Sequence, residues 1–444
     1  MMYEENEEIT QEAVSGSGDT PKSLLVSEIA KETTPRADIS KKGMVSSKGS
    51  FFGGLVVGVL VTCLLVIGTV VIRDAAAAKE EIRSGTVLTK GTIEKLKNLE
   101  RIINTYYYDV SEEEAEPLED GMYRGMVMAL GDPYADYYSE SKLEEVLNTT
   151  EGIYYGIGAY MSLDQEIGGA RIAGVFVGKP AEQAGLRDND LIVKIDGENV
   201  TGLELSEIVA RVKGEEGTTV RLTIYREGEP DYLEIDVTRA LIESPTVNSE
   251  MLEDNIGYIQ IEEFDDVTLD QFTDAWATIK GSDARGLILD LRSNPGGNVS
   301  TVTDIARELL PEGIIVYTLD KNGKRKEYTC DGENEIQIPL VVLINDYSAS
   351  ASEILAGAIK DYEIGTLVGT KTFGKGIVQS VISLADGTAV KLTVSAYYTP
   401  NGNNIHGIGI EPDVVCDFDA KAYYEDGVDN QLNKAIEVIK SKIN

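Results

Sequence analysis

Three short segments in the second half of the chain contain residue types that could act together in catalysis. One is the turn SASAS at 348–352, which follows the apolar run LVVLI and precedes an apolar helical pattern. Its middle residue, Ser350, would lie at a helix N-terminus, where the helix dipole and free backbone N–H groups can stabilise an oxyanion. The local sequence also allows a structural interpretation, because Ser350 and Glu353 have the spacing of a capping box.

The second segment is GTKTFGKGIVQ at 369–379, in which Lys375 lies between two glycines. A lysine can act as a general base only when it is neutral, which requires burial to lower its usual pKa of about 10.4 by roughly 3 units. The flanking glycines permit such burial, although an isolated lysine is usually a solvated surface charge. Gln379 shares a face with Lys375 in either a strand or a helix, so it could hold the amine by a hydrogen bond.

The third segment is the turn DLRSNPGGN at 290–298, which follows the apolar run GLILD. If this run is a parallel strand, the turn opens at the carboxyl edge of the sheet, where α/β proteins place their sites. There it could form an oxyanion hole. Asn-Pro-Gly-Gly is also strong turn chemistry in its own right, so a plain turn remains an alternative.

The elements around these segments indicate an α/β fold. The runs GYIQI, GLILD and LVVLI are apolar on both faces, which predicts a mostly parallel sheet covered by helices on both sides. Residues 150–240 instead alternate short β-branched runs with turns, as a β-rich domain does. Apolar residues at helical spacing predict helices within 79–149, with a stop at Gly131-Asp132-Pro133, and a closing helix within 420–444.

The N-terminal part has a different character. Residues 1–50 have the composition of a disordered tail, and residues 51–72 form an uncharged apolar run long enough to cross a bilayer as a helix. More basic residues precede this span than follow it, and those that follow lie among acidic residues. The positive-inside rule therefore favours a cytoplasmic N-terminus. We therefore expect residues 73–444 to lie outside the cytoplasm.

Composition excludes several functions. The formal net charge of −36 disfavours binding to nucleic acid and contact with anionic lipid headgroups. His406 is the only histidine, so a histidine-rich metal site is excluded and any Ser-His-Asp triad would have to use it. Cys63, Cys330 and Cys416 lack CxxC spacing and allow at most one disulfide. We expect neither a metal nor a cofactor.

Taken together, SASASEI, the FGKG segment with its lysine 25 residues after Ser350, and the following VQ resemble the carboxy-terminal processing proteases, a serine protease family with a Ser-Lys dyad. The resemblance covers nearly everything after residue 90. Further segments that carry it are LGDPY at 130–134, GYIQIEEF at 257–264, DLRSNPGG at 290–297 and TPNGNNIHGIGIEPD at 399–413.

This resemblance implies a role for each candidate residue. Ser350 would be the nucleophile, Lys375 the base and Gln379 the partner that orients the base. The backbone N–H groups of Gly297 and Ala351 would form the oxyanion hole. One supporting acidic residue is implied as well, Asp361.

Residues 150–240 resemble a PDZ domain of the type that this family carries, on the segments YYGIGAYM and VGKPAEQAGLRDNDLIVKIDG. The backbone amides of Gly156, Ile157 and Gly158, which follow Tyr155, would capture a terminal carboxylate while the substrate adds as a strand. A glycine-rich hairpin without a ligand is the structural alternative.

The sequence thus predicts an α/β protease core with a mostly parallel sheet, a β-rich PDZ domain, helical N- and C-terminal segments and one transmembrane helix. The expected divisions are 1–50, 51–72, 79–149, 150–240, 241–419 and 420–444. The predicted function is a plasma-membrane serine endopeptidase, extracytoplasmic and bacterial, that acts on proteins or peptides with apolar C-termini. The family and the helical ends suggest a homodimer. The alternatives are a non-catalytic PDZ scaffold at the membrane and a trypsin-like PDZ protease, which would need a histidine before its serine.

Overall fold

The computed structural model describes residues 87–108, 117–164 and 167–443. The chain divides into two compact units, Met1–Glu112 and Glu113–Asn444. Each unit is described by itself.

The described part of the first unit contains the helix α2 (Lys90–Tyr106). It begins after Thr89, whose Oγ1 accepts a hydrogen bond from the N–H of Thr92 at 3.2 Å. The predicted span at 51–72 lies outside the described residues. Among the residues that are described, no helix is both long enough and apolar enough to cross a membrane.

The second unit is built on a sheet of six strands, five of which are parallel. The sheet confirms the predicted α/β core with a mostly parallel sheet. Its strands, in spatial order, are β10 (Val247–Leu252), β11 (Ile256–Ile261), β12 (Gly286–Asp290), β15 (Leu340–Ile344), β16 (Gly365–Gly369) and β19 (Val414–Val415). Only β10, at one edge, runs antiparallel to its neighbour.

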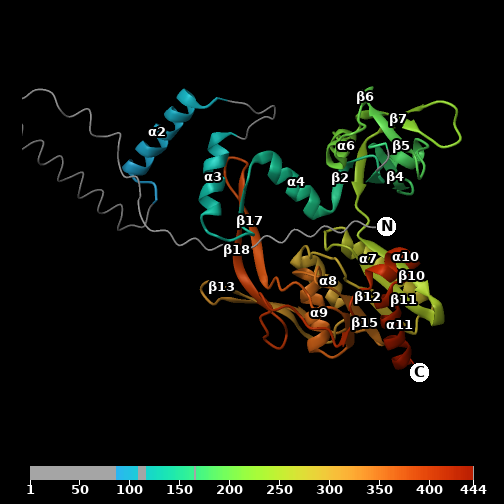
Figure 1. The fold of residues 1–444 in the computed structure, drawn as a ribbon. Helices are drawn as coiled ribbons and strands as arrows, with labels where there is room; N and C mark the ends of the chain where they lie inside the picture. The colour runs from blue at the N-terminus through green and yellow to red at the C-terminus, as the bar shows by residue number, and fades with distance from the viewer. Residues whose placement is uncertain (1–86, 109–116, 165–166, 444) are drawn as a thin grey trace, which may run out of the picture. The chain divides into compact units, whose positions relative to one another are not determined.

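Helices cover both faces of this sheet, as Figure 1 shows around β15. Alternate residues of β15 pack to opposite sides: Val342 belongs to one apolar core, and Val341 belongs to the other with Ala435 and Ile439. The strand LVVLI is apolar throughout because it is buried on both faces. The helices of the first face are α7 (Thr268–Gly281), α8 (Val299–Arg307) and α9 (Ala351–Asp361), and that of the second is α11 (Asn430–Ile443).

A second, antiparallel sheet stands beside this core. Its order is β1 (Asp136–Tyr138), β18 (Ala389–Tyr398), β13 (Gly313–Asp320) and β14 (Arg325–Cys330), and β17 (Ile377–Ser383) also pairs with β18. The chain reaches β1 from α3 (Leu118–Met128) and leaves it through α4 (Glu140–Glu151). The shorter elements of the core are the 3-10 turn η1 (Glu253–Asn255) and the helix α10 (Ala420–Asp426).

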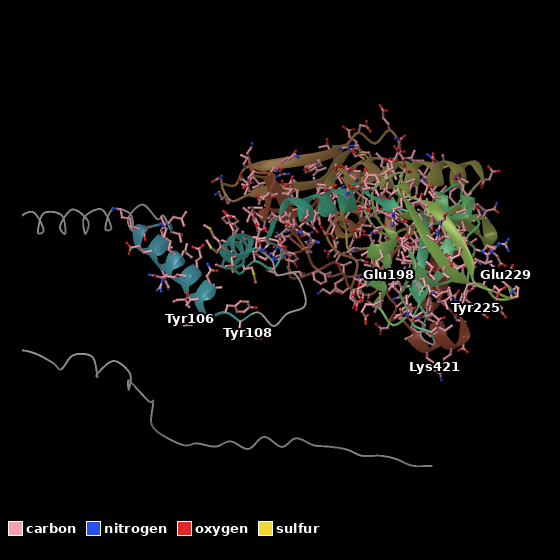
Figure 2. The ribbon with its side chains drawn as sticks, turned by 90° about the horizontal axis from the view of Figure 1, so that it is seen from above. Tyr106, Tyr108, Glu198, Tyr225, Glu229 and Lys421 are labelled. Carbon is pink, nitrogen blue, oxygen red and sulfur yellow. The ribbon has the colours of Figure 1, made fainter. Side chains whose placement is uncertain are left out.

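The segment between α4 and the core forms the expected β-rich domain. Its sheet runs in the order β3 (Ala159–Leu163), β4 (Ala170–Val175), β5 (Leu191–Ile195), β7 (Thr219–Tyr225) and β8 (Leu233–Thr238), with β6 (Glu198–Asn199) on β5. The helices are α5 (Pro180–Gln183) and α6 (Leu205–Val212), and β2 (Ile153–Gly156) pairs with β9 (Ala240–Glu243) where the chain enters and leaves. Exposed side chains of this domain include Glu198 on β6, Tyr225 at the end of β7 and Glu229 in the turn that follows β7 (Figure 2).

Candidate active site

The turn SASAS places its three serines in different environments. Ser348 and Ser352 are fully buried, and their hydroxyls donate to the carbonyl oxygens of Leu291 at 2.8 Å and Asn294 at 3.0 Å. These two hydroxyls tie the turn to the segment that follows β12. Ser350 lines a cavity instead. Of the three, only Ser350 is therefore placed to react with a bound molecule.

The backbone of Ser350 is strained, since its φ of 53° and ψ of −110° lie in a region that residues with a Cβ rarely adopt. Such a conformation costs on the order of 1–3 kcal/mol and persists only where surrounding contacts impose it. Here the N–H of Ser350 donates to Glu353 Oε2 at 2.9 Å, and its carbonyl oxygen accepts from the hydroxyl of the buried Tyr397 at 3.0 Å. The sharp turn between β15 and α9 presents the serine at the carboxyl edge of the sheet.

Glu353 connects this turn to the lysine segment. Its carboxylate is fully buried and accepts four hydrogen bonds. Oε2 accepts from the N–H groups of Ser350 and, at 2.8 Å, Lys375, while Oε1 accepts from Thr372 Oγ1 at 2.6 Å and from the N–H of Gly374 at 2.7 Å. These donors occupy acceptor positions on both carboxylate oxygens. One side chain thus fixes the backbone of both Ser350 and Lys375.

The NPGG turn packs directly on the serine. A Cβ added at Gly296 would lie 2.7 Å from Ser350 Cβ and 2.9 Å from Ala351 N, which only a glycine permits. The buried Asn294 fixes this contact: its Oδ1 accepts the N–H of Gly296 at 2.8 Å and its carbonyl oxygen accepts the N–H of Ala349 at 3.0 Å. Within the described residues, the N–H groups of Gly297 and Ala351 have no acceptor. Both remain available to an oxyanion.

Lys375 is half-buried, with its Nζ 4.8 Å from the centre of the Tyr134 ring. Burial lowers the pKa of its amine, and the positive charge of Lys391 lowers it further. Glu353 has the opposite, smaller effect on this pKa, because a nearby carboxylate favours the ammonium form. The net direction is the one that a general base requires.

A cavity of about 380 Å³ brings the candidate residues together. Ser350, Lys375, Gln379 and Gly297 all line it, together with apolar side chains that include Ile354, Val378 and Tyr397. Gln379 lies opposite a register shift in β18, and its side-chain amide donates to Thr393 Oγ1 at 3.2 Å. In this conformation the amide is therefore bonded to Thr393.

Two other candidate residues do not line this cavity. Asp361 lies at the end of α9, where its carboxylate accepts the N–H of Asn401 at 2.8 Å. His406 is exposed. Its backbone approaches Gly376, since a Cβ there would lie 2.6 Å from His406 N.

The residues proposed to bind a peptide end lie at the start of the open edge of the β-rich sheet. Tyr155 and Gly156 end β2, Ile157 is buried, and Gly158 leads into the edge strand β3 with a φ of 76°. The carbonyl oxygens of Ile157 and Gly158 accept hydrogen bonds from within the domain. This fixes the loop and leaves one side of β3 unpaired in the sheet.

The thiols of Cys330, which is buried, and Cys416 are both free. No group of three or more His, Cys, Asp or Glu side chains in the described ranges could hold a metal ion.

Sequence reasoning missed several residues around the site. Glu353 appeared only as a capping residue, although its S-x-x-E spacing was the available signal. Tyr134 and Lys391 gave no comparable signal, because their relation to Lys375 depends on how distant segments meet. Thr372 gave none either, because its hydroxyl bonds to Glu353 of another segment. Lys391 could have been noticed only by knowing the register of β18 on β17, which pairs Gln379 with Thr393 and Val381 with Lys391.

A serine on a strained turn beside two free backbone amides is the arrangement of a serine-type peptidase, and the β-rich domain precedes it in the chain. Comparison with known proteins agrees: the sequence profile of peptidase family S41 matches residues 255–416, and that of the PDZ domain matches residues 171–226.

Similar proteins identify the family of the chain within this class of peptidases. The carboxyl-terminal-processing protease of Synechocystis sp. is 39% identical over 294 residues, which are 65% of this chain and 69% of that protein. Carboxy-terminal processing protease CtpA of Bacillus subtilis is 36% identical over 319 residues, 72% of this chain and 67% of that protein. A solved photosystem II D1 C-terminal processing protease is 30% identical with a TM-score of 0.43, covering 74% of this chain and 94% of that one. The chain belongs to the carboxy-terminal processing protease family.

Proposed function

We propose that this peptidase cleaves proteins and peptides with apolar C-termini by a Ser350–Lys375 dyad, and that it works outside the cytoplasm on a membrane anchor. The observation that carries the proposal is the single cavity lined by Ser350, Lys375 and the NPGG turn. Gln379 lines it as well. A non-catalytic scaffold would have no need for this combination of side chains.

In the proposed reaction, the neutral amine of Lys375 accepts the proton of the Ser350 hydroxyl while Oγ attacks the scissile carbonyl carbon. The oxyanion that forms is stabilised by the N–H groups of Gly297 and Ala351. The Lys375 ammonium then donates its proton to the leaving amine, and the C–N bond breaks. Water, deprotonated by the same lysine, hydrolyses the ester on Ser350 and regenerates the hydroxyl.

For the base to act, its amine has to leave the Tyr134 ring and approach the hydroxyl. We propose that Gln379 orients the amine in that step, after exchanging its bond to Thr393 for one to Lys375. Asp361 has a supporting role through the segment it holds at Asn401. No metal or cofactor takes part in these steps.

The PDZ domain is proposed to select substrates by a free C-terminus. The loop from Tyr155 to Gly158 would supply backbone N–H donors to the carboxylate, and the open edge of β3 would pair with the residues before it. Charge-assisted hydrogen bonds of this kind contribute about 1.5–3 kcal/mol each.

Amidation of a substrate's C-terminus is therefore expected to lower kcat/KM by roughly one to two orders of magnitude. The measurement compares one peptide that ends in an apolar residue with its amidated form at equal concentration. A third peptide, amidated and carrying a terminal aspartate, controls for the loss of negative charge alone. Equal binding and equal cleavage of the free and amidated peptides would rule out recognition of chain ends by this loop.

We propose further that residues 51–72 anchor the protein in the plasma membrane of a bacterium, with residues 1–50 in the cytoplasm. External protease added to intact spheroplasts is then expected to digest the region after residue 73 and to spare an epitope placed on the N-terminal tail. Detergent-treated spheroplasts, in which both should be digested, provide the control. Loss of the tail epitope with survival of the catalytic region would reverse the topology.

A homodimer is a further part of the proposal. It is supported by apolar side chains that α2 exposes in the described structure, which include Leu99, Ile102 and Ile103. No nucleic-acid partner is proposed, because the chain carries a formal net charge of −36.

A further inference from the structure

A second lysine, Lys391, lies in the cavity that contains the proposed dyad. Its side chain is neither buried nor fully exposed, and within the described residues its ammonium makes no ion pair or hydrogen bond. A charged group of this kind is expected either to face solvent or to have a carboxylate partner. Among the described residues no carboxylate forms an ion pair with Lys391, which lines the cavity of Lys375, and the reaction proposed above assigns it no role.

The strand register explains why Lys391 points into the cavity. On β18, residues Lys391 and Thr393 fall on one face, because side chains alternate along a strand and the register shift lies beyond Thr393. Thr393 lies opposite Gln379 on β17, and Lys391 lies opposite Val381. Gln379, Val381 and Lys391 all line the cavity, so this face of the β17–β18 ribbon forms one of its walls.

On its other side, β18 pairs with β1, and Lys391 lies opposite Asp136. The loop just before β1 carries Tyr134, over whose ring the Lys375 amine lies. The loop before β17 and the strand β18 thus bring Lys375 and Lys391 to the same end of the cavity. Their like charges are close enough for Lys391 to act on Lys375.

The charges around Lys375 act in opposite directions. Burial and Lys391 favour the neutral amine, whereas Glu353 and the Tyr134 ring favour the ammonium. Hydrogen bonds to Thr393 and to the N–H of Tyr134 lower the pKa of the nearby Asp132 carboxyl, and the charges of His406 and Lys391 lower it less. Titratable or charged groups surround this end of the cavity on several elements. They are Glu353 on α9, Asp136 and Tyr138 on β1, Lys391 and Tyr397 on β18, Asp132 and Tyr134 before β1, and Glu263 after β11. His406, which does not line the cavity, acts on Asp132.

We propose that Lys391 is a positioning residue for the dyad, whose ammonium favours the neutral, proton-accepting form of the Lys375 amine. Lys391 touches neither the nucleophile nor the scissile bond in this proposal. It acts through Lys375 alone, as a neighbouring cation does for other catalytic amines. The inference rests on the proposed dyad and adds the residue that tunes it.

Lys391→Met is expected to raise the pKa of the Lys375 amine by about half a unit to one unit, because it removes one like charge. The acidic limb of the pH profile of kcat/KM should move up by the same amount, with a 3- to 10-fold loss of kcat/KM on that limb. Lys391→Glu should move it further, and Lys391→Arg should restore the wild-type position. Lys371→Met, which removes an exposed lysine paired with Glu411 on the neighbouring loop, is the matched control and should leave the limb in place.

A titration without catalysis separates this proposal from the proposed function. Full-length Ser350→Ala protein is labelled at the lysine Cε positions with carbon-13, and the Lys375 signal is assigned by its loss in Lys375→Arg. Its pKa is then followed by NMR with and without Lys391→Met. An unchanged Lys375 pKa would overturn the role of Lys391, whatever the activity. Equal shifts in Lys391→Met and Lys391→Arg would overturn it too, since they would indicate altered packing. Failure of the dyad would appear separately, as activity that survives Lys375→Ala.

Discussion

Replacement of Ser350 or Lys375 by alanine is expected to lower kcat/KM by about three orders of magnitude or more, because each variant removes one partner of the proposed proton transfer. The double variant should be no worse than either single one, since two residues that act as a unit are lost together. Hydrolysis of a peptide with an apolar, free C-terminus gives the measurement.

Two controls make this result specific to a Ser-Lys mechanism. His406→Ala should retain nearly all activity, because the side chain is exposed and does not line the cavity. A chelator should also leave activity intact. Full activity in folded Lys375→Ala protein, or abolition by His406→Ala with the fold preserved, would contradict the dyad.

Glu353→Gln is expected to lower kcat/KM by about 10²- to 10³-fold although Glu353 does no chemistry. An amide offers one acceptor oxygen, so two of the four donors that bond to the carboxylate would lose their partner. Each unsatisfied buried donor costs about 1–3 kcal/mol. Because of this penalty, we expect the strained turn at Ser350 and the segment of Lys375 to lose their fixed relative position.

The measurement combines kcat/KM with urea unfolding, and Glu425→Gln, at an exposed position on α10, is the matched control. We expect the fall in activity to exceed what the unfolded fraction explains, with kcat changing more than KM. Activity that declined only in proportion to the folded fraction would reduce Glu353 to a residue of general stability.

The sequence alone predicted those parts of the fold that depend on local residue patterns. Runs apolar on both faces predicted the parallel strands, and small-residue turns at their carboxyl ends predicted where the site would form. The antiparallel sheet was not predicted, because β1, β13 and β18 are distant in sequence and pair only through tertiary contacts. This sheet carries Gln379 and Lys391, so one wall of the cavity was invisible before the structure.

In the candidate site, too, local contacts could be predicted from the sequence and contacts between distant segments could not. Ser350 was singled out with the help of family resemblance, and the burial of Ser348 and Ser352 supplies the physical reason. Glu353 had been given a local role as a helix cap, and the structure adds the donors of Thr372, Gly374 and Lys375. Spacing reveals partners within one turn of a helix, but it does not reveal partners that arrive from another strand.

The carboxylate that joins the N–H groups of Ser350 and Lys375 also limits how this enzyme can be switched off. With both backbones bonded to one buried side chain, a regulator has little means of drawing the two segments apart without breaking that site. The side chain of Lys375 is not held by this carboxylate, and its amine lies over the Tyr134 ring. Its rotation about four single bonds takes place far faster than a rearrangement of loops or domains. Regulation at the proposed dyad would then act on the rotamer of Lys375 and on access to the cavity. The inactive and active forms of the enzyme would have nearly the same backbone at this site.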